Sequence, residues 1–237
     1  MNNANVVYKE LTYLGHYGNP NKFTEWYSND KKTHTWCGMF QDYVVKKDMK
    51  LNWFDDCSNF AYVPTIVSWG KSKGWWDTNY KNAKEGDLVI YNWYPKKKNH
   101  YSHVEMVAEV KGNNVVSIGG NTDKGVTKNN VTKKSRNKKY VAGIVHLPYT
   151  QFELTRKLEK GCKGDDVKLL QKELKIRGYD LGKSGSNKDG IDGDFGKNTA
   201  KAVKKYQKDT KCKKVDEIVG KETATKLGWK WTPTKTK

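Results

Sequence analysis

The sequence predicts an α+β fold followed by a small helical bundle. Two observations support the first part: a helix-periodic stretch comes early, and several short apolar stretches typical of strands follow it. A third observation is that tryptophan and tyrosine are dense up to about residue 149, whereas the remainder is lysine-rich and helix-periodic. The chain has 237 residues, enough for one large domain or two small ones. We place a short linker near residues 148–155.

One amphipathic helix is predicted around residue 40. Trp36, Phe40 and Val44 follow an i, i+4, i+8 spacing, which puts the three side chains on one helix face. Thr33 and Thr35 precede this stretch and are candidates for the N-cap.

Four strands are expected after this helix. Each apolar run is short and is bounded by turn residues, as strands of an antiparallel sheet commonly are. The runs cover residues 88–91, 104–110, 115–118 and 141–147. The helix therefore comes first and the sheet second, which is an α+β arrangement.

The second part of the chain contains a weak internal repeat. The turn at residues 192–196 is echoed at residues 215–220, with Glu217 standing where the first turn has Gly193. Helical stretches precede and follow these turns, at residues 167–174, 199–206 and 223–227. We expect a bundle of about 70 residues.

The charge of the chain indicates a polyanionic partner. Lys and Arg number 45 against 26 Asp and Glu, so the formal net charge is +19, and the excess is spread over both halves. Such a field favours nucleic acid, an anionic membrane surface or an acid-rich cell wall. No apolar run approaches the roughly 20 residues of a membrane span, and the first residues lack the pattern of a secretory signal. We therefore expect a soluble protein that is made in a cytoplasm.

Cys37 is a candidate nucleophile. It lies at the predicted start of the helix, where unpaired N–H groups and the helix dipole stabilise a thiolate, and Gly38 beside it leaves the backbone open to a substrate carbonyl. The other cysteines form no CxxC pair with it, so neither disulfides nor zinc are expected. The structural alternative is that Cys37 is a small buried apolar residue.

His103 is the candidate base, because a strand position fixes its side chain. Glu105 shares its strand face, but two residues along a strand is about 6.8 Å, which we take as too far to hold the imidazole easily. If the following hairpin closes through three residues, Asn121 stands opposite His103 and is expected to orient the ring. The alternative is a surface or core histidine.

Residues 30–147 resemble the CHAP family of cysteine, histidine-dependent amidohydrolases and peptidases. Four motifs carry the resemblance, in the order of the family: Trp36-Cys37-Gly38-Met39-Phe40, Gly86-Asp87-Leu88-Val89, Ser102-His103-Val104 and Gly119-Gly120-Asn121-Thr122. The resemblance implies a papain-like catalytic domain over residues 1–150, with Cys37 as nucleophile, His103 as base, Asn121 as orienting amide, and Trp36 and Gly38 at the oxyanion site. Many members carry Glu where this chain has Gly119.

Residues 158–228 resemble a three-helix, type 1 peptidoglycan-binding domain. The pattern includes Leu158-x-x-Gly161, the turn from Asp192 to Gly196, and Val219-Gly220-x-x-Thr223. The resemblance implies a wall-binding domain over residues 156–232. The expected wall contacts are Tyr179, Asp192, Asp194 and Phe195.

Together these resemblances imply a modular hydrolase of Gram-positive peptidoglycan, of the phage endolysin type. The bond is left open between an N-acetylmuramoyl-L-alanine amidase and a peptidoglycan endopeptidase. Such a protein accumulates in the host cytoplasm and reaches the wall through holin pores. Its partners are peptidoglycan and anionic wall polymers, without nucleic acid or membrane insertion, and we expect a monomer.

No cofactor is required, although Asp30 is a weak calcium candidate, since some CHAP members hold calcium just before the nucleophile. The functional alternatives are a non-catalytic wall-binding protein and a basic nucleic-acid-binding protein.

Overall fold

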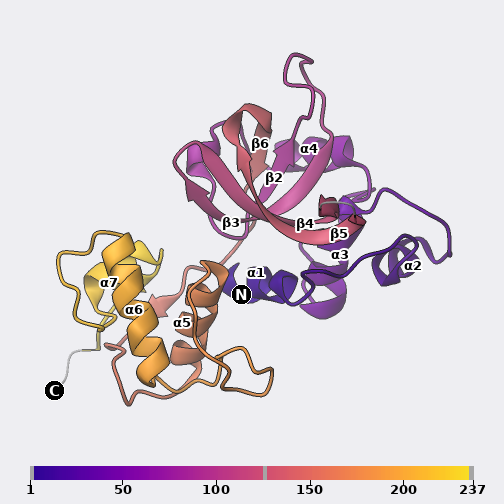
Figure 1. The fold of residues 1–237 in the computed structure, drawn as a ribbon. Coiled ribbons are helices and arrows are strands. Elements are labelled where there is room, and N and C mark those ends of the chain that lie inside the picture. The colour runs from indigo at the N-terminus through magenta and orange to yellow at the C-terminus, as the bar shows by residue number, and fades with distance from the viewer. Residues whose placement is uncertain (1–2, 125–126, 235–237) are drawn as a thin grey trace. The chain divides into compact units, whose positions relative to one another are not determined.

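The computed structural model describes residues 3–124 and 127–234, and the chain divides into two compact units (Figure 1). The N-terminal unit covers residues 9–148, and the C-terminal unit joins the residues from Tyr149 onward to those up to Tyr8. The boundary near the N-terminus therefore falls within helix α1 (Asn3–Leu11). In the part of the chain that the structure describes, no helix has the length and apolar character needed to cross a membrane.

The N-terminal unit is a mixed α+β structure built on an antiparallel sheet, as the sequence predicts. The six strands lie in the order β1-β6-β2-β3-β4-β5. Their bounds are Trp76–Asp77, Leu88–Tyr91, His103–Lys111, Asn114–Lys124, Thr127–Asn137 and Val141–Val145 for β1 to β6. The helical elements are α2 (Lys22–Ser28), α3 (Cys37–Asp42), η1 (Tyr43–Asp48), α4 (Val63–Ser72), η2 (Tyr80–Asn82) and η3 (Lys138–Tyr140).

Strand β5 is the main element that sequence reasoning missed. Its residues are mostly polar, with Val131 as its only large aliphatic side chain, so no apolar run marks it. It lies at the edge of the sheet, paired only with β4 among the named strands. Polar and basic side chains are typical of edge strands, where they discourage pairing with other chains.

Helix α3 supplies the core of this unit. Trp36 and Phe40 are fully buried, and Phe23 from α2 stacks on Trp36 with ring centroids 5.5 Å apart. The helix lies against β3 and β4, and the π-helical turn η1 continues it (Figure 1). The predicted helix is confirmed, but its capping is not. Trp36 is the N-cap, and no side chain caps the helix, so neither Thr33 nor Thr35 has that role.

The β3–β4 hairpin contains a bulge that sets the register of the site. Lys111 pairs with Asn114, so the loop has two residues rather than three. The pairing shifts at Ala108, between the Val107–Ser117 and Glu109–Val116 pairs. One extra residue on β3 restores the register that a three-residue loop would give, because a bulge places two residues opposite one. Met106 and Val107, which lie on the site's side of the bulge, therefore have the register expected for a three-residue loop, although the loop has only two residues.

The described residues from Tyr149 onward contain three helices, in agreement with the prediction. They are α5 (Asp165–Ile176), α6 (Lys197–Asp209) and α7 (Lys221–Lys226). A short parallel pair, β7 (Glu153–Leu154) and β8 (Lys230–Trp231), brings the two ends of this segment together. Leu158, Leu170, Leu174, Val203 and Val219 are fully buried and form the core.

Two buried glutamines hold the two repeated turns in the same way. Gln171 donates to Asp192 Oδ1, the Asp194 carbonyl and Thr199, and it accepts from the Gly193 N–H. Each of these bonds has a counterpart around Gln207, as described next. Gly193 has φ +81°, a left-handed conformation that suits glycine.

Gln207 donates to Asp216 Oδ1, the Ile218 carbonyl and Thr223, and it accepts from the Glu217 N–H. Glu217, with φ +66°, adopts the left-handed conformation of Gly193. The internal repeat seen in the sequence is therefore a structural repeat, in which one amide side chain closes each turn.

Replacing Gln171 by Leu tests this account. The change keeps a buried side chain but leaves the turn's N–H and carbonyl groups without their partner, at a cost of about 3 kcal/mol. We expect a lower unfolding temperature and faster hydrogen exchange at residues 192–199. Lys201→Leu on the exposed face of α6 is the control and should change neither quantity. Equal behaviour of the two variants contradicts the role of Gln171.

Candidate functional site

The structure brings Cys37 and His103 together. Cys37 is the first residue of α3 and His103 the first residue of β3, and their side chains are 4% and 5% exposed. The thiol and the imidazole interact through a side-chain hydrogen bond. The backbone N–H groups of Val104 and Gly38 also lie within hydrogen-bonding reach of the sulfur. The two residues singled out as nucleophile and base therefore share one site.

The environment of the pair favours its charged form. Burial acts to raise the pKa of Cys37, but the positive charge and hydrogen bond of His103 outweigh it, so the pKa of the thiol lies below its ordinary value. Burial likewise acts to lower the pKa of His103, but Cys37 and Glu105 together raise it to about 9. The two groups therefore stabilise each other as a thiolate beside an imidazolium.

The group that holds the imidazole is Glu105, and this corrects the sequence-based expectation. His103 Nε2 lies 3.1 Å from Glu105 Oε1, although the two residues are neighbours on one strand face. The spacing of about 6.8 Å applies to the backbone, whereas both side chains are long enough to lean toward each other. With Nε2 engaged by Glu105, Nδ1 is the ring nitrogen left for the thiol.

Glu105 is itself held by a buried network. Its carboxylate accepts hydrogen bonds from Ser117 Oγ at 2.5 Å and from Arg136 Nε and Nη2 at 3.1 and 2.5 Å. Burial acts to raise the pKa of Glu105, but His103 and Arg136 lower it to about 2, so the carboxyl is ionised at neutral pH. Because β5 was not predicted, sequence reasoning gave no reason to consider Arg136.

Aromatic rings enclose this network. The Arg136 guanidinium lies over Trp93, 4.9 Å from the ring centroid, and over Tyr91 at 5.3 Å. Trp93 is also 5.6 Å from the His103 ring. The rings shield the Glu105–Arg136 pair from water, and the cation–π contacts stabilise the guanidinium.

Gly119 makes room for Glu105. A Cβ atom at position 119 would overlap the Cγ atom of Glu105 and would lie 3.1 Å from its Oε1. The carboxylate of Glu105 therefore occupies the space that a side chain at position 119 would take.

Asn121 does not hold the imidazole in this structure. It lies in an irregular part of β4, with φ +57°, where the pairing with β5 shifts between Gly119 and Thr122. Both Asn121 and His103 are described residues, and no hydrogen bond joins their side chains. The predicted orienting amide is thus replaced, in this geometry, by the carboxylate of Glu105.

Gly38 has a packing role that the sequence did not suggest. A Cβ at position 38 would overlap the carbonyl oxygen of Phe60, so the backbone of residues 60 and 61 occupies that side of the helix. Glycine is therefore required at position 38 for packing, and its predicted place at the oxyanion site stays a prediction. Trp36, the other residue expected at the oxyanion site, is fully buried and occupies the N-cap position without a side-chain capping bond.

Asp30, the weak calcium candidate, is engaged by protein groups. Its Oδ1 atom lies 2.8 Å from His34 Nε2 and accepts from the Lys32 N–H at 2.9 Å. Within residues 3–124 and 127–234, no group of three or more His, Cys, Asp and Glu side chains is arranged to hold a metal ion.

The predicted wall contacts of the C-terminal unit lie in different environments. Phe195 is only 2% exposed, so its ring belongs to the core and the expectation of a wall contact is wrong for it. Asp192 accepts from Gln171, and the exposed Asp194 pairs with Lys163. Tyr179 is half-buried and donates to Asp209.

The remaining cysteines are free thiols outside this site. Burial raises the pKa of Cys57, which is the opposite of the shift at Cys37. Cys57 therefore lacks the ionised sulfur that a nucleophile needs.

Residues 163–227 match a family model described as "Putative peptidoglycan binding domain". The match supports a peptidoglycan-binding domain in the C-terminal part of the chain and peptidoglycan as its partner. It also indicates a protein associated with the cell wall. No solved structure matches the chain significantly.

Replacing Glu105 by Gln tests the electrostatics of the site. The carboxylate helps to raise the pKa of His103 to about 9, so its loss should move the His103 titration to lower pH by at least about one unit. Histidine-labelled NMR spectra recorded across pH 5–10 measure the shift. Glu109→Gln, on the same strand but paired with Lys111, is the control and should leave the titration in place. An unchanged titration in Glu105→Gln contradicts the assigned contact.

Proposed function

We propose that this chain is a peptidoglycan hydrolase of the endolysin type, with a papain-like CHAP domain as its N-terminal unit. The observation that carries the proposal is the buried series Cys37, His103, Glu105 in a chain whose C-terminal part matches a peptidoglycan-binding family. A low-pKa thiol paired with a histidine is the machinery of acyl transfer to cysteine. The bonds that fit both units are the amide bonds of peptidoglycan.

The first half of the proposed reaction forms an acyl-enzyme. The Cys37 thiolate attacks an amide carbonyl carbon, and the electron pair of the C=O bond moves onto its oxygen. N–H groups at the start of α3 stabilise this oxyanion. As the tetrahedral intermediate collapses, the C–N bond breaks and the His103 imidazolium donates its proton to the leaving amine. A thioester to Cys37 and a free amine result.

The second half releases the acyl group. Neutral His103 removes a proton from water, the hydroxide attacks the thioester carbonyl, and the C–S bond breaks to regenerate the thiolate and imidazolium. Glu105 and Arg136 are positioning residues in this scheme. Glu105 fixes the ring so that Nδ1 faces the sulfur, and Arg136 keeps Glu105 ionised.

The C-terminal unit supplies attachment to the substrate. Binding to peptidoglycan raises the concentration of scissile bonds near the catalytic unit, as in any tethered pair of sites. The net charge of +19 favours association with the anionic polymers of Gram-positive walls.

The bond that is cut is either the muramoyl–L-alanine amide or a peptide bond of the stem or crossbridge. Mass spectrometry of fragments released from purified walls separates the two. An amidase frees whole stem peptides, whereas an endopeptidase leaves peptides on the glycan.

Replacing Cys37 by Ala tests the proposed activity. Without the sulfur no acyl-enzyme forms, so clearing of purified walls should slow by at least about a thousandfold. Binding of the variant to those walls should be unchanged, because the C-terminal unit is intact. Cys57→Ala, which removes a buried thiol of raised pKa, is the control and should retain activity. Clearing at the normal rate by Cys37→Ala contradicts the proposal.

Transferring the carboxylate from position 105 to position 119 tests whether the charge of Glu105 orients the imidazole. We expect Glu105→Ala to lower kcat/KM by about a hundredfold, because an unheld imidazole loses its orientation. Adding Gly119→Glu to that variant should restore at least tenfold, since the new side chain enters the vacated space. Glu105→Ala with Gly119→Gln is the uncharged control and should restore less. Equal activity of the two double variants contradicts a role for the charge.

A further inference from the structure

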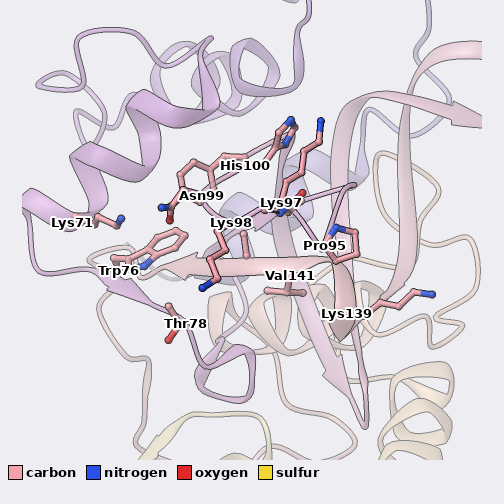
Figure 2. Close-up of a pocket in the computed structure, with 13 residues that line it drawn as sticks. Lys71, Trp76, Thr78, Pro95, Lys97, Lys98, Asn99, His100, Lys139 and Val141 are labelled. Carbon is pink, nitrogen blue, oxygen red and sulfur yellow. Dashed lines mark hydrogen bonds between the residues drawn. The ribbon is translucent and has the colours of Figure 1, made fainter.

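A basic pocket lies in the N-terminal unit among residues that the proposed catalysis does not use. It is a cavity of about 320 Å³ built from strands β1 and β6, the loop between β2 and β3, and residues from α4 and η3 (Figure 2). The residues that line it are Lys71, Trp76, Thr78, Asn92, Pro95, Lys97, Lys98, Asn99, His100, Tyr101, Lys139, Val141 and Ala142.

The charge of this pocket is of one sign. Four lysines and a histidine line it, and none of the lining residues is acidic. Lys71, Lys97, Lys98 and Lys139 come from three separate segments and are exposed. Within the described part of the chain, no salt bridge involves any of the four ammonium groups. The Lys97 and Lys139 ammonium groups lie over the rings of Tyr94 and Tyr140, at 5.1 and 4.9 Å from the centroids, at the edge of the pocket. Four lysines without an acidic partner around one cavity create a positive potential that an anion would relieve.

Aromatic rings form one corner of the pocket. Trp76 and Tyr101 meet edge to face, with ring centroids 6.0 Å apart at 75°. The Lys71 ammonium lies 5.6 Å from the Trp76 centroid and 5.9 Å from that of Tyr101. The rings therefore hold one cation by cation–π contacts and offer apolar faces beside it. Such a corner fits the carbon skeleton of a polyol or sugar that carries an anion.

We propose that this pocket binds a phosphate-bearing polyol unit of an anionic wall polymer. The cavity of about 320 Å³ far exceeds the roughly 10–15 Å³ that a single water needs, so it accommodates a larger group than a lone ion. Lysines bind phosphate as point charges that can approach from several directions. The described lining contains lysines and no arginine.

A wall polymer fits better than nucleic acid. Single strands are held by grooves in which successive rings stack successive bases. Here two rings meet edge to face in one corner, which leaves no such platform. The match of the C-terminal part to a peptidoglycan-binding family also places the protein at a wall. This inference goes beyond the proposed hydrolase activity and does not depend on the chemistry of Cys37.

The pocket is also continuous in sequence with the catalytic strand. His100 and Tyr101 belong to the loop that leads directly into His103. Ser102, the last residue of this loop, has its Oγ atom 3.0 Å from His100 Nδ1. A polymer bound here is held on the same loop that presents the proposed base.

The test measures binding to the full chain carrying Cys37→Ala, so that no cleavage occurs. The probes are inorganic phosphate, a synthetic glycerol phosphate hexamer and a single-stranded DNA hexamer, titrated by calorimetry at 50 and 200 mM salt. The pocket variant combines Lys71→Gln, Lys97→Gln, Lys98→Gln and Lys139→Gln. The charge-matched control combines Lys31→Gln, Lys32→Gln, Lys47→Gln and Lys84→Gln, all exposed lysines outside the pocket.

We expect the glycerol phosphate hexamer to bind the unsubstituted chain more tightly than inorganic phosphate does. The pocket variant should bind it at least about tenfold more weakly, and the control within about threefold of the unsubstituted chain. Equal loss in both variants would show that only the overall charge attracts the polymer. Tighter, lysine-dependent binding of DNA, or no hexamer binding at all, also overturns the proposal. None of these outcomes depends on whether Cys37 is catalytic.

Discussion

The buried carboxylate of Glu105 is the interaction on which the proposed site depends. It joins a histidine on its own strand, a serine on β4 and an arginine on β5, and no part of it is exposed. An isolated buried carboxylate would take up a proton, but three donors keep this one charged. Removing one partner of such a buried cluster costs about 3–5 kcal/mol. The charge that raises the pKa of His103 therefore also fastens three adjacent strands together.

The sequence was informative about the residues on single elements. Cys37 could be predicted because one helix start explains its chemistry, and His103 because it begins an apolar strand. Glu105 was considered and set aside, because backbone spacing says little about where two long side chains end. Arg136 could not be found at all, since its strand lacks the apolar alternation by which strands are recognised. Contacts across a sheet depend on register, and the bulge at Ala108 changes the register without leaving a clear mark in the sequence.

In the C-terminal unit, too, the sequence revealed features formed by adjacent residues but not contacts between residues far apart in the chain. Its repeated turns are visible in the sequence because their residues are adjacent. The glutamines that close them, Gln171 and Gln207, precede their turns by very different distances along the chain, so no common spacing reveals the shared role. Phe195 illustrates the reverse error, because a turn aromatic that suggested an exposed contact is a core residue. Turn motifs predicted the backbone here and not the direction of the side chains.

Because of the bulge at Ala108, the alternation of side chains between the two faces of the sheet is offset by one residue between the start and the end of strand β3. Glu105 and Val107 share one face of the sheet, whereas Glu109, only two residues further on, lies on the opposite face. A hairpin of the same length that lacked the bulge would close through a three-residue loop and keep the pairing of Met106 and Val107 unchanged. Only the side chains between the tip and the bulge, residues 109–111, would then change face, so the hairpin end of β3 can be rearranged without inverting the proposed catalytic face.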